Sequence, residues 1–470
     1  MLKTVSKNLP LLVSLISLLI LLVGINRPLA GQHDWNSVFF GNAARNHLRL
    51  GLLKTKLGVA TNINPQPNET LGYYTHHPIL MPLFLAGSLA IFGPAEPDWA
   101  IRLVPVISAT VMIYFLFKLV RRLWGTSAAI LAACFLTFSP MLLYYSKIPI
   151  HETVVLGFLG FTFWAYFAKR YWLVVIGLIL SQLTSWAGYY LSLYLPLHSL
   201  LFAHLPRRKS LILFLIAPLM FLVFILHSFW LTGNLESLFT AFLFRVNIPS
   251  ASQIFGFSYG KFLILQARWI VIYFTRIIVL LSLGWLAGII IRRRITLQDS
   301  YLLLLLIFGF THNALFRQQA FIHDYTLIYA LPFFAVSAAV TLFKLKLNVV
   351  VLLVVLVIFA TERLSYVQAL FHSGDANPGV PLGKAINRWT TPASSTLILN
   401  TELMRFYDVF INYYADRKVI AADKLTPELM NQVDYIVIPK SHDYVTAEDK
   451  YWLYTHFPHR EIPNGIFFQL

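Results

Sequence analysis

Long apolar runs, separated by short polar segments, occupy most of residues 1–361. The runs at 99–120 and 211–231 reach the length of about 20 residues that a helix needs to cross a bilayer. If each run is one crossing, the pattern predicts about eleven transmembrane helices. The chain is therefore expected to be an α-helical polytopic membrane protein over residues 1–361.

Basic clusters between the runs set the expected direction of each helix. Loops on the cytoplasmic side are enriched in Lys and Arg, so we place there the clusters at residues 121–122, 169–170, 207–209, 292–294 and 344–346. The first run, 9–23, is interpreted as a retained helix rather than a cleaved signal peptide, and either choice gives the same orientation. The first outer loop then spans residues 27–98, and a later outer loop spans 232–261.

The run at residues 79–92 is apolar but short for a crossing. A full crossing here would place every later basic cluster on the outer side, against the usual charge asymmetry. We interpret it as a helix that lies along the outer surface, and the first outer loop is expected to contain such interfacial helices.

The pattern changes after residue 361. Residues 362–470 are mixed and charged, with short apolar runs at 396–399 and 433–438 and apolar residues at helical spacing over 402–414. Alternating short strands and helices predict a small α/β domain. The parity of the preceding crossings places this domain on the extracytoplasmic side.

Composition agrees with a membrane location: 58% of the residues are hydrophobic and 12% are charged, against about 25% charged in ordinary soluble domains. The net charge of +17 arises from the loop clusters, so it indicates topology rather than nucleic-acid binding. A single cysteine, Cys134, excludes an intramolecular disulfide. The sequence contains no internal repeat. It also contains no glycine-rich nucleotide-binding motif, so nothing indicates ATP hydrolysis.

Candidate chemistry gathers in the outer loops. Asp34 follows His33 just beyond the first helix, where it could accept a proton from a substrate, or simply be a solvated loop residue or a helix cap. His76 and His77 precede Pro78; adjacent histidines point in different directions, so each could ligate a metal only with other loops, contact a phosphate, or lie at the interface.

Arg102 lies one turn into its helix, where a charge needs a partner: either Asp98 or a lipid phosphate. The second outer loop carries Lys147 and Glu152, the latter also suited to a helix N-terminus. The late outer loop contains four further candidates, Arg317, His323, Asp324 and Tyr325. Because three separate outer loops place histidine and carboxylate at the membrane boundary, we expect one shared site.

A family pattern emerges from the order of these features. They are, in chain order, Asp34, His77-Pro78, Phe92-Gly93, Arg102-Leu103-Val104-Pro105, Arg121-Arg122-Leu123-Trp124-Gly125, Ser139-Pro140, Glu152 and His323-Asp324-Tyr325. In this order they resemble the bacterial lipid-dependent glycosyltransferases of the GT-C fold, in the branch of the aminoarabinose transferases of lipid A and the protein O-mannosyltransferases. The resemblance covers residues 1–190 well and 190–340 in patches, and does not extend to the C-terminal domain.

The resemblance implies an inverting enzyme of a bacterial-type inner membrane that moves a sugar from a polyprenyl-phosphate donor to a lipid, glycan or protein acceptor at the outer face. It implies Asp34 as the base, assisted or replaced by Glu152. Arg102, Lys147 and Arg317 become candidates to stabilise the leaving phosphate, and His323 and Asp324 to orient donor or acceptor.

Two departures leave metal dependence open. His76 and His77 stand where the aminoarabinose transferases carry Glu-Lys, and Trp35 follows Asp34 where many members have a second acid. A divalent metal is therefore possible but not required. The alternatives are a transporter or flippase of lipid-linked sugars, which would need polar groups near the bilayer midplane and internal symmetry, and a scaffold protein, which would need no clustered acids and histidines.

Overall fold

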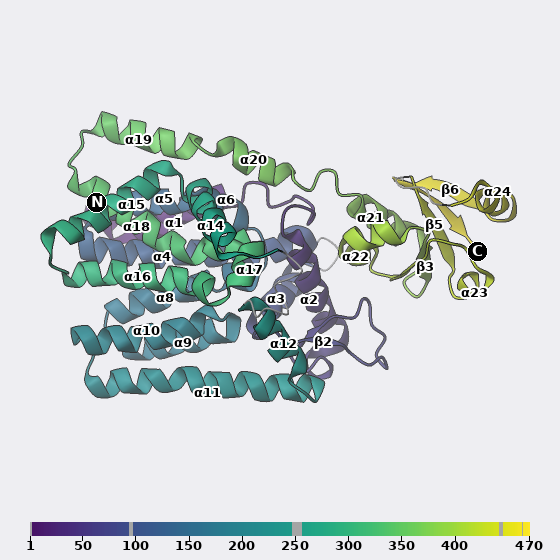
Figure 1. The fold of residues 1–470 in the computed structure, drawn as a ribbon, viewed down its shortest axis with the longest axis horizontal. Helices are drawn as coiled ribbons and strands as arrows, with labels where there is room; N and C mark the ends of the chain where they lie inside the picture. The colour runs from purple at the N-terminus through teal and green to yellow at the C-terminus, as the bar shows by residue number, and fades with distance from the viewer. Residues whose placement is uncertain (1, 94–96, 247–255, 441–444, 463) are drawn as a thin grey trace.

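Two parts make up the computed structural model, a helical bundle and a small sheet domain at one of its ends (Figure 1). The structure describes residues 2–93, 97–246, 256–440, 445–462 and 464–470. The helices that run along the bundle are α1 Leu2–Leu21, α4 Pro97–Trp124, α5 Thr126–Thr137, α6 Pro140–Tyr145, α8 Leu156–Phe167, α9 Tyr171–Thr184, α10 Ala187–Phe202, α11 Arg207–Thr232, α15 Arg276–Arg292, α16 Leu297–Leu315, α18 Leu331–Lys344 and α19 Val349–Thr361.

Length and hydropathy make this chain an integral membrane protein. Among the described residues, 4 helical stretches are long and apolar enough to cross a bilayer: Asp98–Trp124, Arg207–Thr232, Asp324–Lys344 and Val349–His372. Several shorter apolar helices pack beside them, and the expected total of about eleven crossings stays a prediction.

The apolar run at residues 262–291 is one of the runs interpreted from the sequence as a single crossing, and it is instead broken into two helices. Helix α14, Tyr259–Phe274, meets α15 at an angle of 108°. Thr275 lies at the break with φ 65°, a left-handed conformation that is rare for a β-branched residue. Both oxygens of the Glu362 carboxylate accept the N–H of Arg276 at 3.2 Å and support the start of α15. Both halves are apolar, so hydropathy alone hides the break.

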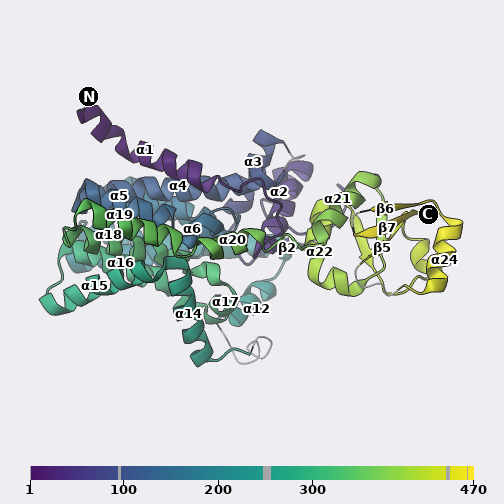
Figure 2. The same cartoon turned by 90° about the horizontal axis from the view of Figure 1, so that it is seen from above.

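The short elements gather at the end of the bundle that faces the sheet domain (Figures 1 and 2). They are α2 Asp34–Lys54, β1 Val59–Ala60, β2 Tyr73–Tyr74, α3 Leu80–Phe92, α7 His151–Val154, α12 Glu236–Arg245, α17 Arg317–Ile322 and the 3₁₀ helix η1 Asp324–Ala330. Helix α3 packs against α2 and α4 at this end, and the interfacial position expected for residues 79–92 stays a prediction. Part of the loop expected at 232–261 lies outside the described residues.

The C-terminal part folds as a five-stranded mixed sheet with order β4-β3-β5-β7-β6. Helix α20, Leu364–His372, follows α19 along the bundle and packs on α6 (Figure 1). The elements of the domain are α21 Gly379–Trp389, β3 Ser395–Ile398, α22 Thr401–Ala415, β4 Lys418–Ala421, α23 Pro427–Met430, β5 Tyr435–Pro439, α24 Ala447–His456, β6 His459–Ile462 and β7 Gly465–Gln469. Strands β3, β4 and β5 are parallel, and β7 is antiparallel to β5 and β6. The strand, helix and strand expected at 396–399, 402–414 and 433–438 correspond to β3, α22 and β5.

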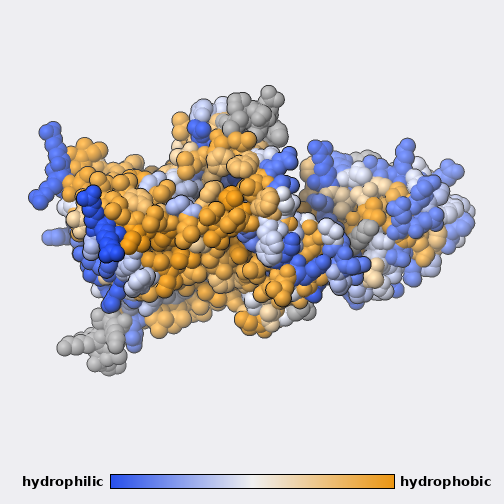
Figure 3. Space-filling model, turned by 90° about the horizontal axis from the view of Figure 1, so that it is seen from below, coloured by the Kyte–Doolittle hydropathy of each residue, from blue (hydrophilic) through white to orange (hydrophobic). Residues whose placement is uncertain are grey.

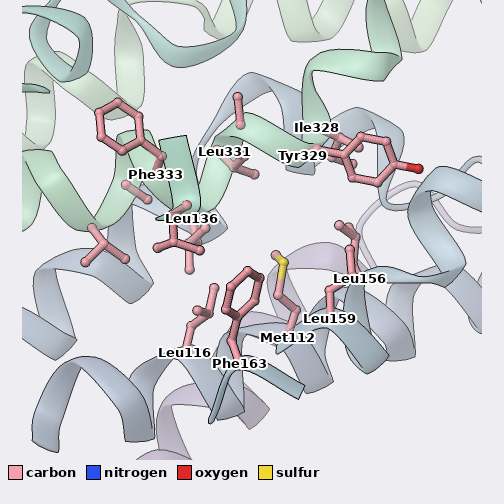
Figure 4. Packing of buried hydrophobic residues seen from close by; sticks show 14 of the residues in the cluster. Met112, Leu116, Leu136, Leu156, Leu159, Phe163, Ile328, Tyr329, Leu331 and Phe333 are labelled. Atoms are coloured by element: carbon pink, nitrogen blue, oxygen red, sulfur yellow. The ribbon is translucent and has the colours of Figure 1, made fainter. Parts of the chain in front are cut away.

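The interior of the bundle is apolar where α4, α8 and η1 meet (Figure 4). Met112, Leu159 and Phe163 surround a void of only about 10 Å³, which is hardly enough for one water molecule. Tight apolar packing at this level leaves the end of the bundle as the place where the polar candidate residues come together.

Candidate active site

A tight turn before α2 holds the carboxylate of Asp34, which is 2% exposed. Its Oδ2 accepts the N–H of Gly31 and Nη2 of Arg102, both at 2.9 Å, and its Oδ1 accepts the Ser37 hydroxyl at 2.7 Å. Asp34 is therefore neither a solvated loop residue nor the cap of α2, whose cap position is His33. A carboxylate has about four acceptor directions, so one direction on Oδ1 stays available to a substrate.

The guanidinium of Arg102 is organised around this turn. Besides Asp34, its Nη2 donates to the carbonyl of Pro28 and its Nη1 to that of Lys147, each at 2.9 Å. Arg102 forms its ion pair with Asp34 rather than with Asp98, whose carboxylate accepts the Tyr414 hydroxyl at 2.8 Å. The Asp34–Arg102 pair is buried on both sides, so it holds the carboxylate in one orientation.

Lys147 is buried next to the same pair, with 2% of its surface exposed. Its ammonium donates to the backbone carbonyl of Leu143. Burial, reinforced by the nearby charges of Arg102 and Arg27, lowers the pKa of Lys147 to about 7. The amine of Lys147 is thus only partly protonated at neutral pH, and an anion that enters would favour its protonated form.

These side chains line a cavity of about 800 Å³ between the bundle and the C-terminal domain. We call it the Asp34 cavity. Arg27, Asp34, Arg102 and Lys147 line it from the bundle, and Tyr407 of α22 lines it from the domain. A molecule in this cavity would contact the free side of the Asp34 carboxylate.

A second cavity of about 890 Å³ adjoins the first, and we call it the Arg245 cavity. Its lining includes His33, Tyr74, His76, His77, His151, Glu152, Arg245, His323 and Tyr325. Arg245, at the end of α12, contacts the carbonyl of His76 at 3.4 Å, the hydroxyl of Tyr74 at 3.3 Å and Nε2 of His77 at 3.4 Å. Sequence reasoning missed this arginine, although a basic residue in an outer loop is itself a signal, because such loops are depleted in Lys and Arg.

Glu152 is 3% exposed in the Arg245 cavity. Burial raises the pKa of Glu152 to about 7, and the charge of Arg245 only partly opposes this. His77 stacks on His151 with ring centroids 4.2 Å apart, and burial lowers the pKa of both imidazoles. Within the described part of the chain, no group of three or more His, Cys, Asp or Glu side chains is placed to hold a metal ion.

The wall between the cavities is the turn that carries His33 and Asp34. His33 lines the Arg245 cavity and Asp34 lines the other, although the two are consecutive. Nε2 of His33 lies 2.9 Å from Oδ1 of Asp324, which also accepts the Tyr145 hydroxyl at 2.6 Å. The Tyr273 hydroxyl donates to the other carboxylate oxygen, Oδ2. Asp324 therefore anchors the wall, and sequence analysis did not single out Tyr145 or Tyr273 as members of the site.

The three outer loops converge, but not every candidate residue reaches a cavity. His323 and Tyr325 lie against His33, with ring centroids 5.5 and 4.9 Å away. Arg317 lines neither cavity. It donates to the carbonyl of Val246 at 3.3 Å and lies over the ring of Tyr259.

Comparisons with known proteins place this geometry in context. Residues 76–232, about one third of the chain, match the family model described as dolichyl-phosphate-mannose-protein mannosyltransferase. A comparison with curated proteins finds no match.

Solved structures match over nearly the whole chain. ArnT from Cupriavidus metallidurans, bound to undecaprenyl phosphate, matches with a TM-score of 0.64 and 14% identity over 97% of both chains. The oligosaccharyltransferase AglB from Archaeoglobus fulgidus, in complex with an inhibitory peptide and a dolichol-phosphate, matches with a TM-score of 0.54 and 16% identity. This match covers 93% of this chain and 70% of AglB. The mycobacterial arabinofuranosyltransferase AftD matches with a TM-score of 0.56 and 13% identity, over 98% of this chain and 40% of AftD.

Proposed function

We propose that this chain, which has the GT-C fold, is an inverting glycosyltransferase that takes a sugar from a polyprenyl-phosphate donor and uses Asp34 as its base. The observation that carries the proposal is the pair of cavities that meet at one turn, with His33 lining one cavity and Asp34 the other. One cavity offers a buried carboxylate with a free acceptor direction, and the other offers the cation Arg245. The likeness to proteins bound to undecaprenyl phosphate and dolichol-phosphate supports a lipid-linked donor.

The stereochemistry assigns each substrate to a cavity. In an inverting displacement the base and the leaving group lie on opposite sides of the anomeric carbon. With Asp34 on the acceptor side, the leaving phosphate lies in the Arg245 cavity. The acceptor oxygen forms its bond to the anomeric carbon as the bond to the donor phosphate breaks; its proton passes to Oδ1 of Asp34, and the electron pair leaves with the phosphate.

This assignment changes the roles expected of the basic residues. Arg245 stabilises the leaving phosphate, since a cation aimed at developing charge is an effective catalytic device. Arg102 belongs to the other side and orients Asp34 through their 2.9 Å contact. Lys147 faces the acceptor cavity with it.

The helix that supplies Arg245 also suits the donor's apolar chain. Phe239, Phe242 and Leu243 on α12 are 57%, 46% and 44% exposed, although α12 also contributes Arg245 to the cavity. The polyprenyl chain would lie along this apolar face while its phosphate reaches Arg245. The acceptor would enter the Asp34 cavity beneath the C-terminal domain, on the extracytoplasmic side of a bacterial-type inner membrane.

Glu152 supports a second assignment of the base. A carboxyl whose pKa is near 7 is matched to proton transfer at neutral pH. It lies in the Arg245 cavity, on the side assigned here to the donor, so Asp34 remains the first choice. Transport of lipid-linked sugars is the other alternative, but the interior around Met112 (Figure 4) is closely packed and leaves a void of only about 10 Å³, which is far too small for a sugar.

Transfer of radiolabelled sugar from purified polyprenyl-phosphate donors to a membrane extract tests the proposal. We expect wild type to be active and Asp34→Asn to lose about 10²–10⁴-fold in rate while its thermal unfolding stays cooperative. Loss in Glu152→Gln with retention in Asp34→Asn would instead make Glu152 the base. If wild type transfers no sugar from any donor in a broad panel, the transporter becomes the better explanation.

A further inference from the structure

A basic groove of about 760 Å³ lies at the opposite end of the bundle, between the starts of α9 and α11. Four of its lining residues are cationic: Lys169, Arg170, Arg208 and Lys209. This end carries the loops assigned to the cytoplasmic side. The groove is remote from the two cavities of the candidate active site, so the proposed transfer reaction gives it no role.

The positive charge of the groove is not neutralised by the protein. No Asp or Glu is among the lining residues, and none of the four cations forms an ion pair within the described residues. Lys209 instead lies 5.2 Å from the centre of the Tyr171 ring. Four like charges around one concave surface repel one another and favour an anionic ligand.

The backbone strengthens the same potential. Helices α9 and α11 both begin at the groove, and neither has an acidic residue in its first turn or a side-chain hydrogen bond at its cap. The first N–H groups of a helix have no partner within the helix and carry partial positive charge. These N–H groups add to the four side chains rather than forming a site by themselves.

The other half of the groove is apolar. Leu173 and Val175 of α9 and Ile212 and Ile216 of α11 continue the lining toward the middle of the bundle. Trp172 beside them is 74% exposed. Figure 3 shows this face of the molecule, where hydrophilic side chains at the end of the bundle border a broad apolar band. A ligand that fits both halves has an anionic head and hydrocarbon chains.

We propose that this groove binds an anionic phospholipid of the cytoplasmic leaflet, with its phosphate head group among the four cations and its acyl chains along α9 and α11. Basic pockets between helices on this side of a membrane are suited to anionic head groups. The bound lipid would tie the first turns of α9 and α11 together and stabilise the folded chain. This inference does not depend on the transferase activity.

The full chain in nanodiscs provides the test. Thermal unfolding is compared between pure phosphatidylcholine and phosphatidylcholine with phosphatidylglycerol, and lipids retained by the protein are counted by native mass spectrometry. The variant replaces Lys169, Arg170, Arg208 and Lys209 with Gln. A control variant replaces Arg293, Arg294, Lys344 and Lys346, which are exposed cations at the same end of the bundle, with Gln.

We expect phosphatidylglycerol to raise the unfolding temperature of wild type and of the control variant by at least about 3 °C, and to leave the groove variant unchanged. If the groove variant does not fold in phosphatidylcholine, the double variant Arg208→Gln, Lys209→Gln replaces it and is expected to lose most of the shift. Equal shifts in all three proteins, equal numbers of retained phosphatidylglycerol molecules, or no shift in wild type would overturn the proposal. So would an equal shift from inorganic phosphate in phosphatidylcholine nanodiscs, because the site would then bind a free anion rather than a lipid.

Discussion

At the scale of single residues, the two buried carboxylates of the site have opposite surroundings. Asp34 receives three hydrogen bonds, one of them from a buried arginine. Glu152 lies among imidazole and phenol rings, where burial raises its pKa to about 7. Two carboxylates with such different environments are suited to different roles, an oriented anion and a group that is protonated for part of the neutral range.

The raised pKa of Glu152 predicts a pH dependence of stability. Its pKa of about 7 in the folded state lies above its ordinary value of 4.5, so its contribution to stability is full below about pH 4.5 and is lost as the pH rises through 7. As the pH rises from 4.5 to 8.5, the free energy of unfolding of Glu152→Gln should increase relative to that of wild type by on the order of 3 kcal/mol. Unfolding temperatures of both proteins across this range measure the difference, and parallel curves would show that Glu152 is not shifted.

Arg245 and Arg317 differ in position, which makes them a matched pair. Arg245 lines the cavity assigned to the donor, whereas Arg317 lines neither cavity. We expect Arg245→Gln to lower kcat by about 10²–10³-fold, the usual loss when one donor to a developing anion is removed. Arg317→Gln should change kcat by less than about fivefold. Steady-state transfer assays compare the two, and the reverse order of effects would place the leaving phosphate beside Arg317.

At the scale of elements, the segment after α20 is pressed against the turn that carries Asp34. A Cβ on Gly374 would come within 2.6 Å of the backbone nitrogen of Gly31, and backbone atoms cannot move aside as a flexible side chain can. Gly374→Ala should therefore cost about 1–3 kcal/mol of stability and shift Asp34 enough to lower activity at least about tenfold. Gly87→Ala on α3, where a Cβ meets nothing within 4 Å, is the control and should leave both thermal unfolding and activity near wild type.

Hydropathy predicted the long apolar helices well, because their length is enough to indicate a crossing. Helices α4 and α11 have 28 and 26 residues, and only a membrane crossing explains apolar runs of that length. The break at Thr275 could not be predicted, because α14 and α15 are both apolar. The bend depends on one residue with positive φ and on Glu362, which lies 86 positions after Arg276.

Local sequence patterns predicted some residues of the candidate site and missed others. Asp34, Glu152 and His323 were found because charged or imidazole groups at a helix end are conspicuous in sequence. Tyr145 and Tyr273 lie on apolar helices, where a tyrosine is common, and what distinguishes them is that each donates a hydrogen bond to Asp324. These two bonds join residues that are 179 and 51 positions apart, and no local sequence pattern reports such separations.

At the scale of the whole molecule, the C-terminal domain helps to build the Asp34 cavity. Helix α22 contributes Tyr407 to its lining and packs against α2. Nη1 of Arg45 donates to the carbonyl of Tyr413 at 2.6 Å, and the guanidinium lies 3.8 Å from the centre of the Tyr413 ring. The domain is thus held by the same helix that begins with Asp34, which couples its position to the acceptor cavity.

Tyr414 offers the sharpest test of this coupling. Its hydroxyl accepts the N–H of Leu29 at 2.7 Å and donates to Asp98 at 2.8 Å, so one atom joins α22 to the segment that precedes Asp34 and to α4. Tyr414→Phe leaves both groups unsatisfied at about 1–3 kcal/mol each. We expect faster hydrogen exchange over residues 401–415 and an acceptor KM raised about fivefold or more with a smaller change in kcat, because a factor of ten in affinity is about 1.4 kcal/mol. Tyr451→Phe, at a side chain that is 73% exposed, should leave both unchanged. An unchanged KM together with faster exchange would mean that the domain covers the cavity without contacting the acceptor.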